Sequence, residues 1–175
     1  MINVHGEQVI GKVSTHIFTC KISDEEMNRQ IIEQIDLQGD QQNHKTNVKA
    51  QMTKWNMIDK PGFNTFAVKL LEIVNEMTKT KYKLNLQPKI KSIWGLKYQS
   101  EQITTEHCHW PAMWSCTYYI NPPKNSSSLY FPEFDYSVKP ENGLLVLFEG
   151  WVKHSVPKQS FDGYRYVVSA NIDHK

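Results

Sequence analysis

From Leu86 onward, the chain consists of short segments in which apolar and polar residues alternate, separated by turn-forming clusters rich in proline, glycine, asparagine and aspartate. Alternation with period two is typical of β-strands that bury one face, and such clusters end strands. The pattern predicts strands over 89–99, 103–109, 114–121, 127–131, 143–148, 153–157 and 164–172. Seven short strands, together with two helices earlier in the chain, favour a double-sheet jelly roll with the helices supporting one sheet.

The N-terminal half supplies the two helices. Ser23 followed by Glu26 has the form of a capping box, and apolar residues at helical spacing predict a helix over 24–37. A second helix is predicted to begin near Pro61, because proline is tolerated in the first turn of a helix. Its buried face should contain Phe66, Leu70, Leu71, Ile73, Val74 and Met77.

Two other segments complete this half. The alternation in 13–18 predicts a strand before the first helix, and the polar residues 38–57 predict a long surface loop or lid. The fold class is therefore mostly β with supporting helices (α+β). At 175 residues, the chain is most simply one domain, with supporting elements over about 1–85 and the jelly-roll core over about 86–173.

Charge and cysteine content exclude several classes of protein. A net charge of +2 argues against a strong nucleic-acid or membrane field, so neither partner is expected. The odd number of cysteines, three, indicates a reducing compartment rather than a disulfide framework. The first residues lack the basic and apolar regions of a secretory signal, and no apolar run approaches the roughly 20 residues of a membrane span. The sequence predicts a soluble, cytoplasmic protein.

Three histidines form the candidate metal site. His107 and His109 are two residues apart, so they share one face of a strand, and His154 lies far downstream. Arg165 follows on the next predicted strand, and it is one of only two arginines in the chain, with Arg29. Three convergent imidazoles and one fixed cation suit an Fe(II) site that also holds a dicarboxylate.

The segment from Trp94 to Asn171 resembles the double-stranded β-helix of the Fe(II)/2-oxoglutarate-dependent oxygenases. It is most similar to the prolyl-hydroxylase-like branch, including small members found in phages. His107-Cys108-His109 stands where that family has His-X-Asp. The other matching pieces are the strands Ser115–Asn121 and Leu129–Glu133, the segment Pro140–Phe148 before His154-Ser155-Val156, and the closing strand from Arg165 to Asn171.

The resemblance implies a role for each residue. His107, His109 and His154 would hold Fe(II), with 2-oxoglutarate as cosubstrate and O₂ as the oxidant. Arg165 would pair with the distal carboxylate of 2-oxoglutarate, with the Tyr119 hydroxyl as a second contact. Tyr98 stands nine residues before His107, where the prolyl hydroxylases have a cosubstrate-contacting tyrosine, and Ser169 shares the inner strand face with Arg165. A phage-encoded protein of this kind would act in the host cytoplasm.

His109 is the one departure from the family pattern, since a carboxylate ligand is usual there. Position 111 is proline, so shifting the frame does not restore the motif. A neutral ligand leaves an Fe(II) site one unit more positive, yet three histidines still make a workable facial site, as in the thiol dioxygenases. We therefore expect a metal-dependent dioxygenase that hydroxylates a C–H bond. A prolyl residue in a protein is a plausible substrate, by analogy with the fold, and a small molecule stays open.

Other interpretations remain open at this point. The protein could be a three-histidine, cupin-like dioxygenase that does not use 2-oxoglutarate, or a non-enzymatic jelly-roll binding protein. The histidines could be ordinary core or surface groups, Arg165 could pair with a buried acid, and Cys108 with Cys116 could indicate structural zinc. Trp94, Trp110, Trp114 and Trp151 are core candidates, although Trp110 and Trp151 are close enough in sequence to the histidines to wall a substrate pocket.

Overall fold

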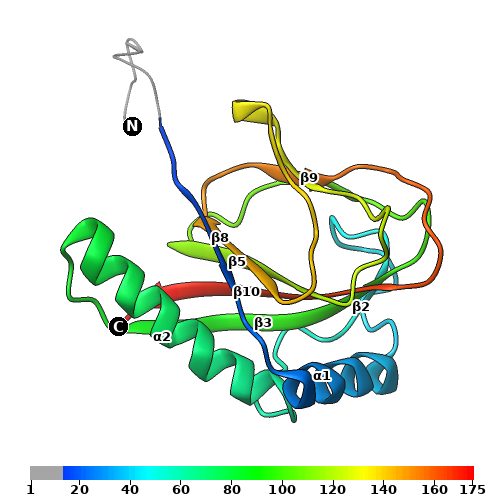
Figure 1. Ribbon diagram of the computed structural model, residues 1–175, viewed down its shortest axis with the longest axis horizontal. Helices are drawn as coiled ribbons and strands as arrows, with labels where there is room; N and C mark the ends of the chain where they lie inside the picture. Colours follow the sequence, from blue (N-terminus) through cyan, green and yellow to red (C-terminus); the bar gives the residue numbers. More distant parts are fainter. Residues whose placement is uncertain (1–13) are drawn as a thin grey trace, which may run out of the picture.

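The computed structural model describes residues 14–175 and contains two antiparallel β-sheets with two helices against one of them (Figure 1). The larger sheet has the order β1 (Ile17–Lys21), β8 (Leu144–Glu149), β5 (Trp114–Ile120), β10 (Arg165–His174), β3 (Pro88–Tyr98) and β2 (Gln51–Met52). The smaller sheet has the order β4 (Thr104–His107), β9 (His154–Val156), β6 (Leu129–Phe131) and β7 (Tyr136–Val138). The predicted jelly roll is confirmed.

Both helices cover the outer face of the larger sheet. They are α1 (Glu25–Gln38) and α2 (Phe63–Tyr82), and Figure 1 shows α2 running from the left to the lower centre and α1 at the lower right. Phe66 of α2 stacks on Tyr118 of β5 with ring centroids 4.8 Å apart. Gly95 of β3 leaves room for Ile35 of α1, because a Cβ at Gly95 would overlap the Ile35 side chain. This layer fixes the larger sheet from behind.

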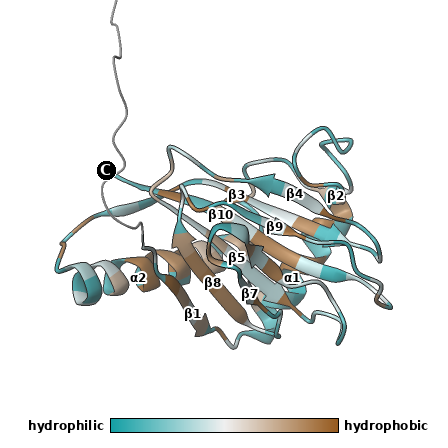
Figure 2. Cartoon of the chain, turned by 90° about the horizontal axis from the view of Figure 1, so that it is seen from above, coloured by the Kyte–Doolittle hydropathy of each residue, from teal (hydrophilic) through white to brown (hydrophobic). Residues whose placement is uncertain are grey.

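A second buried layer lies between the two sheets. It includes Trp94, Leu96 and Tyr98 of β3, Tyr119 of β5 and Val167 of β10. Every residue of β5 and all of β8 except Glu149 are buried, so both faces of these strands are covered, and β8 is coloured mostly hydrophobic in Figure 2. The polar side chains that enter this layer are therefore exceptional, and they mark the candidate site.

Most predicted elements are confirmed, with corrections at the first helix and the first strand. The N-cap of α1 is Asp24, not Ser23, and its carboxylate accepts a hydrogen bond from the Met27 amide at 3.0 Å. Aspartate caps a helix as well as serine does, so the sequence offered two adjacent candidates. The first strand covers Ile17–Lys21, later than the predicted 13–18, of which Val13 lies outside the described residues.

Two short strands were not predicted. β7 (Tyr136–Val138) follows the 3₁₀ turn Pro132–Phe134 and pairs with β6, and β2 (Gln51–Met52) lies inside the polar segment predicted as a loop. Each has only two or three residues, which is too few for alternation to be recognised.

The segment 39–57 connects the two sheets at one end of the jelly roll. β2 pairs with β3 of the larger sheet, whereas Val48 forms a β-bridge to Thr104 of β4 in the smaller sheet. The Lys49 amide donates to the Ile103 carbonyl at 2.8 Å, and the Thr105 amide donates to the Asn47 carbonyl at 3.0 Å. The predicted lid is thus tied to both sheets.

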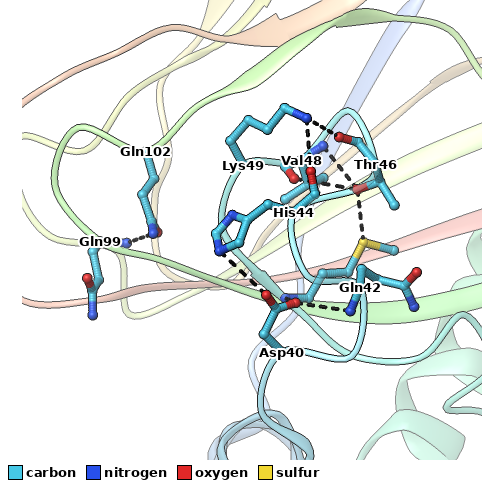
Figure 3. Close-up of polar contacts among 9 residues, drawn as sticks. Asp40, Gln42, His44, Thr46, Val48, Lys49, Gln99 and Gln102 are labelled. Carbon is cyan, nitrogen blue, oxygen red and sulfur yellow. Dashed lines mark hydrogen bonds and ion pairs between the residues drawn. The ribbon is translucent and has the colours of Figure 1, made fainter.

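Local contacts also order the 40–49 loop (Figure 3). The Lys49 ammonium donates to the carbonyls of His44 and Thr46 at 3.0 and 2.8 Å, and the Thr46 hydroxyl accepts the Val48 amide at 3.2 Å. His44 Nε2 lies 3.5 Å from an Asp40 carboxylate oxygen. These contacts hold Val48 with its side chain buried between the sheets.

Neither α1 nor α2 is long and apolar enough to span a bilayer. The cytoplasmic location stays a prediction.

Candidate metal centre

The three predicted ligands lie together between the sheets. β4 ends at His107, the following turn carries His109, and β9 begins at His154. One ligand atom from each lies within 4.8 Å of the other two, and the ring centroids are 4.4–5.0 Å apart. A group of three ligand atoms at that spacing could hold a single metal ion. Of the described residues, only these three form such a group.

Backbone carbonyls set the orientation of two imidazoles. Nδ1 of His107 lies 2.8 Å from the Thr105 carbonyl oxygen, and Nδ1 of His154 lies 3.0 Å from the Val152 carbonyl oxygen. A carbonyl only accepts hydrogen bonds, so each Nδ1 carries the proton and each Nε2 has a free lone pair. Such hydrogen bonds are the usual outer support of metal-binding histidines.

His109 is positioned through its backbone. Its amide donates to the Gly150 carbonyl at 2.7 Å, and its own carbonyl accepts the Ala112 amide at 2.8 Å. The Gly150 amide in turn donates to the Met113 carbonyl at 2.9 Å. These bonds tie the His109 turn to the β8–β9 connection that leads to His154, and so the two ligands are held relative to each other.

Burial keeps all three imidazoles neutral. Desolvation, with a smaller contribution from His107, lowers the pKa of His109 to about 3. Burial likewise lowers the pKa of His107, and it lowers the pKa of His154 well below its ordinary value. Neutral imidazole is the form that binds metals, so the site does not have to lose protons at neutral pH.

The donor set suits iron better than structural zinc. Cys108 lies between two ligands in the chain but is exposed, and it does not belong to the three-residue cluster. Glu106 lies 3.7 Å from the Lys153 ammonium instead of joining the cluster. Structural zinc sites have four protein ligands, whereas three leave positions open for exogenous groups. The structural-zinc alternative therefore has no support here.

Arg165 is buried between the sheets, with 1% of its surface exposed. Its guanidinium donates to the Ser127 carbonyl at 2.8 Å and lies over the Tyr98 ring at 4.0 Å. Its Nε has no partner, and no carboxylate among residues 14–175 pairs with it. A buried charge without a counter-ion costs several kcal/mol, so this arrangement is adapted to an anionic ligand.

The histidines and Arg165 line one enclosed cavity of about 40 Å³. Tyr98, Tyr119 and Ser169 also line it, so every residue predicted to contact iron or cosubstrate reaches the same space. The Tyr98 hydroxyl is engaged with Thr104 at 2.5 Å, and burial raises the pKa of Tyr98. The Tyr119 pKa is raised for the same reason, which keeps its phenol protonated as a donor.

Sequence reasoning missed several residues that line this cavity. Thr104 fixes the Tyr98 hydroxyl, and Val48 enters from the 39–57 segment. Neither position carries a sequence signal, because a threonine on a strand and a valine in a polar loop are both common. Thr117 lies opposite Ser169 in the β5–β10 register and adds a second hydroxyl to the wall.

An outer groove of about 360 Å³ opens on the other side of His107 and His109. Its walls include Trp55 from the 39–57 segment, Trp94, which also lines the inner cavity, and Trp110 from the His109 turn. Trp151, the other tryptophan predicted as a possible wall, lies outside both spaces, and its indole N–H donates to Glu149 at 3.0 Å.

A larger hollow lies elsewhere. It measures about 670 Å³, between β1 and α2, and is lined mainly by apolar side chains such as Phe18, Ile73 and Met77. It lacks convergent ligand atoms and an unpaired buried charge, so we place the site at the histidines instead.

No family model matches the sequence, and neither does any curated protein. Solved structures do match the fold. A viral collagen prolyl hydroxylase from Paramecium bursaria Chlorella virus, in complex with 2-oxoglutarate, is 16% identical with a TM-score of 0.65, over 89% of this chain and 94% of that one. A prolyl-4-hydroxylase from Pseudomonas putida is 13% identical with a TM-score of 0.70, over 93% and 94%.

A third match is a prolyl hydroxylase from Trichoplax adhaerens, in complex with a peptide fragment of a hypoxia-inducible factor. It is 14% identical, with a TM-score of 0.63, over 90% of this chain and 82% of that one. The alignments cover 89–93% of this chain. The chain therefore has the double-stranded β-helix fold found in prolyl hydroxylases that use Fe(II) and 2-oxoglutarate.

Proposed function

We propose that this protein is an Fe(II)- and 2-oxoglutarate-dependent dioxygenase that hydroxylates a C–H bond. One observation carries the proposal: three neutral, pre-oriented imidazoles and an unpaired buried arginine line the same cavity. Bound Fe(II) would supply activation of O₂ coupled to oxidative decarboxylation of 2-oxoglutarate. The chain would act as one oxygenase domain, with residues 86–173 holding the site and residues 1–85 supporting it.

Three histidines of the cavity are suitable ligands for Fe(II). His107, His109 and His154 would bind it, and three protein ligands leave the remaining positions to cosubstrate and O₂. The carbonyls of Thr105 and Val152 hold two of the rings in the tautomer that presents Nε2. Apolar walls from residues such as Leu129 and Val156 limit the access of water to the centre.

The residues also fit a dicarboxylate. Arg165 would pair with the distal carboxylate, because its Nε lacks a partner and a guanidinium matches a carboxylate in two-point geometry. The Tyr119 hydroxyl would donate a second bond. The Tyr98 ring would support the position of the Arg165 guanidinium, which lies over it. The Tyr98 hydroxyl would not contact the cosubstrate, because it is engaged with Thr104. Ser169 would contribute a polar wall.

Binding would require the inner cavity to widen. A volume of about 40 Å³ corresponds to about three water positions, which is less than 2-oxoglutarate needs. Val48 is the part of the wall supplied by the 39–57 segment, so movement of this segment is the simplest way to admit the cosubstrate.

The prime substrate would be a polypeptide, with a prolyl residue as the candidate target. Two observations support this proposal: the outer groove beside the ligands, and the similarity to a prolyl hydroxylase that holds a peptide. A small-molecule substrate remains the alternative. The outer groove is open to solvent, as a binding site for an extended polypeptide substrate must be.

The test is an anaerobic titration of the Fe(II)-loaded protein with 2-oxoglutarate, monitored by the weak visible charge-transfer band of the chelate. A saturable band that disappears in Arg165→Ala, and persists in the surface variant Arg29→Ala, supports the proposal. Iron binding without a band would favour a three-histidine dioxygenase in which Arg165 holds the substrate's own carboxylate. Failure to bind iron would leave a jelly-roll binding protein.

A further inference from the structure

The outer groove and the inner cavity share an unusual electrostatic property. Neither is lined by an aspartate or a glutamate among the described residues, whereas Arg165 lines the inner cavity and Lys91, which lies 3.3 Å from an Asp173 carboxylate oxygen, lines the groove. The ligands themselves are neutral. The charge of a divalent cation would be balanced by that of a dianionic cosubstrate, so the positive charge of Arg165 would remain. A carboxylate ligand would cancel that charge, but the neutral imidazole of His109 stands in its place and does not.

The rim of the groove adds further positive charge. Lys45, Lys49 and Lys54 are exposed, and each is next in sequence to a groove-lining residue, namely Thr46, Val48 and Trp55 respectively. Within residues 14–175, none of the three pairs with a carboxylate. Lys49 instead caps the carbonyls of the 40–49 loop (Figure 3).

One group of acidic residues lies away from the groove, whereas Glu106, next in sequence to the groove-lining His107, lies 3.7 Å from the Lys153 ammonium. α1 carries Glu25, Glu26, Glu33 and Asp36 against the single cation Arg29, and this helix packs behind the larger sheet. Lys45, Lys49 and Lys54 therefore give the rim of the groove a local positive charge in a chain whose net charge is only +2. Such a local field selects anionic partners by steering and by charge complementarity.

Two tryptophans provide the apolar part of the groove. Trp110 is 73% exposed although it stands directly after a metal ligand, and the turn that carries it is held by the backbone bonds of His109 and Gly150. Trp55 is 46% exposed and packs edge-on against Trp94 at 4.9 Å. Large aromatic surface on an ordered turn, beside a reactive centre, is adapted to contact a ligand.

We infer that the prime substrate is an acidic polypeptide segment. Its reacting residue would lie in the outer groove against Trp110 and Trp55, and its flanking carboxylates would face Lys45, Lys49 and Lys54. This inference rests on the proposed function and adds the substrate's charge and the residues that select it. Trp110 is the specificity-determining aromatic residue, and the three lysines are the specificity-determining charges.

A single-stranded nucleic acid also combines negative charge with stacking surfaces, but it fits less well. Nucleic-acid-binding domains generally have a pI above about 9 and use arginine for phosphate contacts. The chain has a pI of about 8.3, and neither of its arginines, Arg29 and Arg165, lies in the groove. A polypeptide carboxylate needs only the isolated lysines that the rim provides.

The experiment measures binding and needs no turnover. Three fluorescein-labelled peptides of equal length, each with a central proline flanked by glutamate, glutamine or lysine, are titrated anaerobically with Fe(II)- and 2-oxoglutarate-loaded protein, and anisotropy is recorded. We expect the glutamate peptide to bind about tenfold more tightly than the glutamine peptide, and the lysine peptide most weakly. Raising the salt concentration should reduce the preference.

Variants localise the effect. The double variant Lys45→Glu/Lys54→Glu should lose the preference for the glutamate peptide, while Lys81→Glu on α2, which does not line the groove, should retain it. Trp110→Ala should weaken binding of all three peptides, and Trp110→Phe should restore most of it. The melting temperature of each variant, compared with the wild type, separates these effects from unfolding.

Three results would overturn the inference: equal affinity for the glutamate and glutamine peptides, tighter binding of a labelled thymidine oligonucleotide, or no binding of any peptide. The two proposals can fail separately. A charge-transfer band without peptide preference would support the dioxygenase proposal and refute the inference of an acidic substrate. Peptide preference in protein that shows no band when it is supplied with Fe(II) and titrated with 2-oxoglutarate would support the groove as the peptide site and refute the dioxygenase.

Discussion

His107 and His154 are direct register partners across β4 and β9, and their ring centroids lie 4.4 Å apart. Each ring is oriented by the carbonyl of the residue two positions earlier, Thr105 and Val152 respectively. The pairing of two short strands thus creates most of the candidate metal site. The third ligand, His109, is added by a turn that leaves the sheet.

Removal of either register partner should abolish stoichiometric iron binding. Loss of a group that hydrogen-bonds to a metal ligand already lowers the metal affinity about 10–100-fold, so loss of the ligand itself should lower it further. Isothermal titration of His107→Ala and His154→Ala with Fe(II) under anaerobic conditions tests this. His16→Ala, which removes a histidine outside the cluster, should bind one equivalent as the wild type does, and equal affinity in all variants would exclude the assigned site.

Arg165→Ala should raise the concentration of 2-oxoglutarate needed for half-saturation by about 100-fold, because a charge-assisted, two-point contact is lost. Iron affinity should change little, since Arg165 is not a member of the histidine cluster. Arg165→Lys should recover only part of the affinity, because an ammonium lacks the forked geometry. An unchanged cosubstrate requirement in Arg165→Ala would disprove the role.

His109→Asp should retain Fe(II) binding and strengthen it, because the carboxylate brings the charge that the neutral site lacks. The same change should reduce the preference for the acidic peptide, since the uncompensated positive unit disappears. Metal titration and the anisotropy assay check the two effects on one protein. Loss of iron from this variant would mean that the His109 turn cannot place a shorter ligand.

The metal-free protein should lose stability as the pH falls below the ordinary histidine pKa. Each ligand histidine has a folded-state pKa below the unfolded value of 6.5, with His109 at about 3, so the unfolded chain binds more protons in this interval. The stabilising effect is complete above pH 6.5 and declines toward pH 3. Urea unfolding across this range should show a shallower decline for His109→Asn than for the exposed control His44→Asn.

Gly150→Ala should weaken metal binding through the backbone. A Cβ at Gly150 would overlap the Ala112 carbonyl oxygen, which belongs to the turn that carries His109. Gly95→Ala offers a matched control, because its Cβ would press on the Ile35 side chain behind the sheet. Both variants should lose about 1–3 kcal/mol of stability through overpacking. Only Gly150→Ala should also reduce Fe(II) affinity, as measured by anaerobic titration.

Much of the site was predictable because strands impose simple rules. Period-two alternation located the strands that carry His107, His154 and Arg165, and side-chain parity placed Tyr119 and Ser169 on the inward face. The turn-forming clusters bounded these strands. The rules failed for β2 and β7, which have too few residues to show a period. They also failed for the N-cap of α1, where Ser23 and Asp24 competed.

By itself, the sequence determined the class of fold, the candidate ligand residues and the arginine predicted to be buried, because these follow from local periodicity and residue chemistry. Only the tertiary structure decided that Arg165 has no acidic partner among the described residues, since a buried counter-ion could have come from any distant segment. The tertiary structure also brought the 39–57 segment across both sheets, with Val48 in the wall of the inner cavity and Trp55 in the groove. Contacts between residues far apart in the chain depend on packing of the whole domain, which local patterns do not encode.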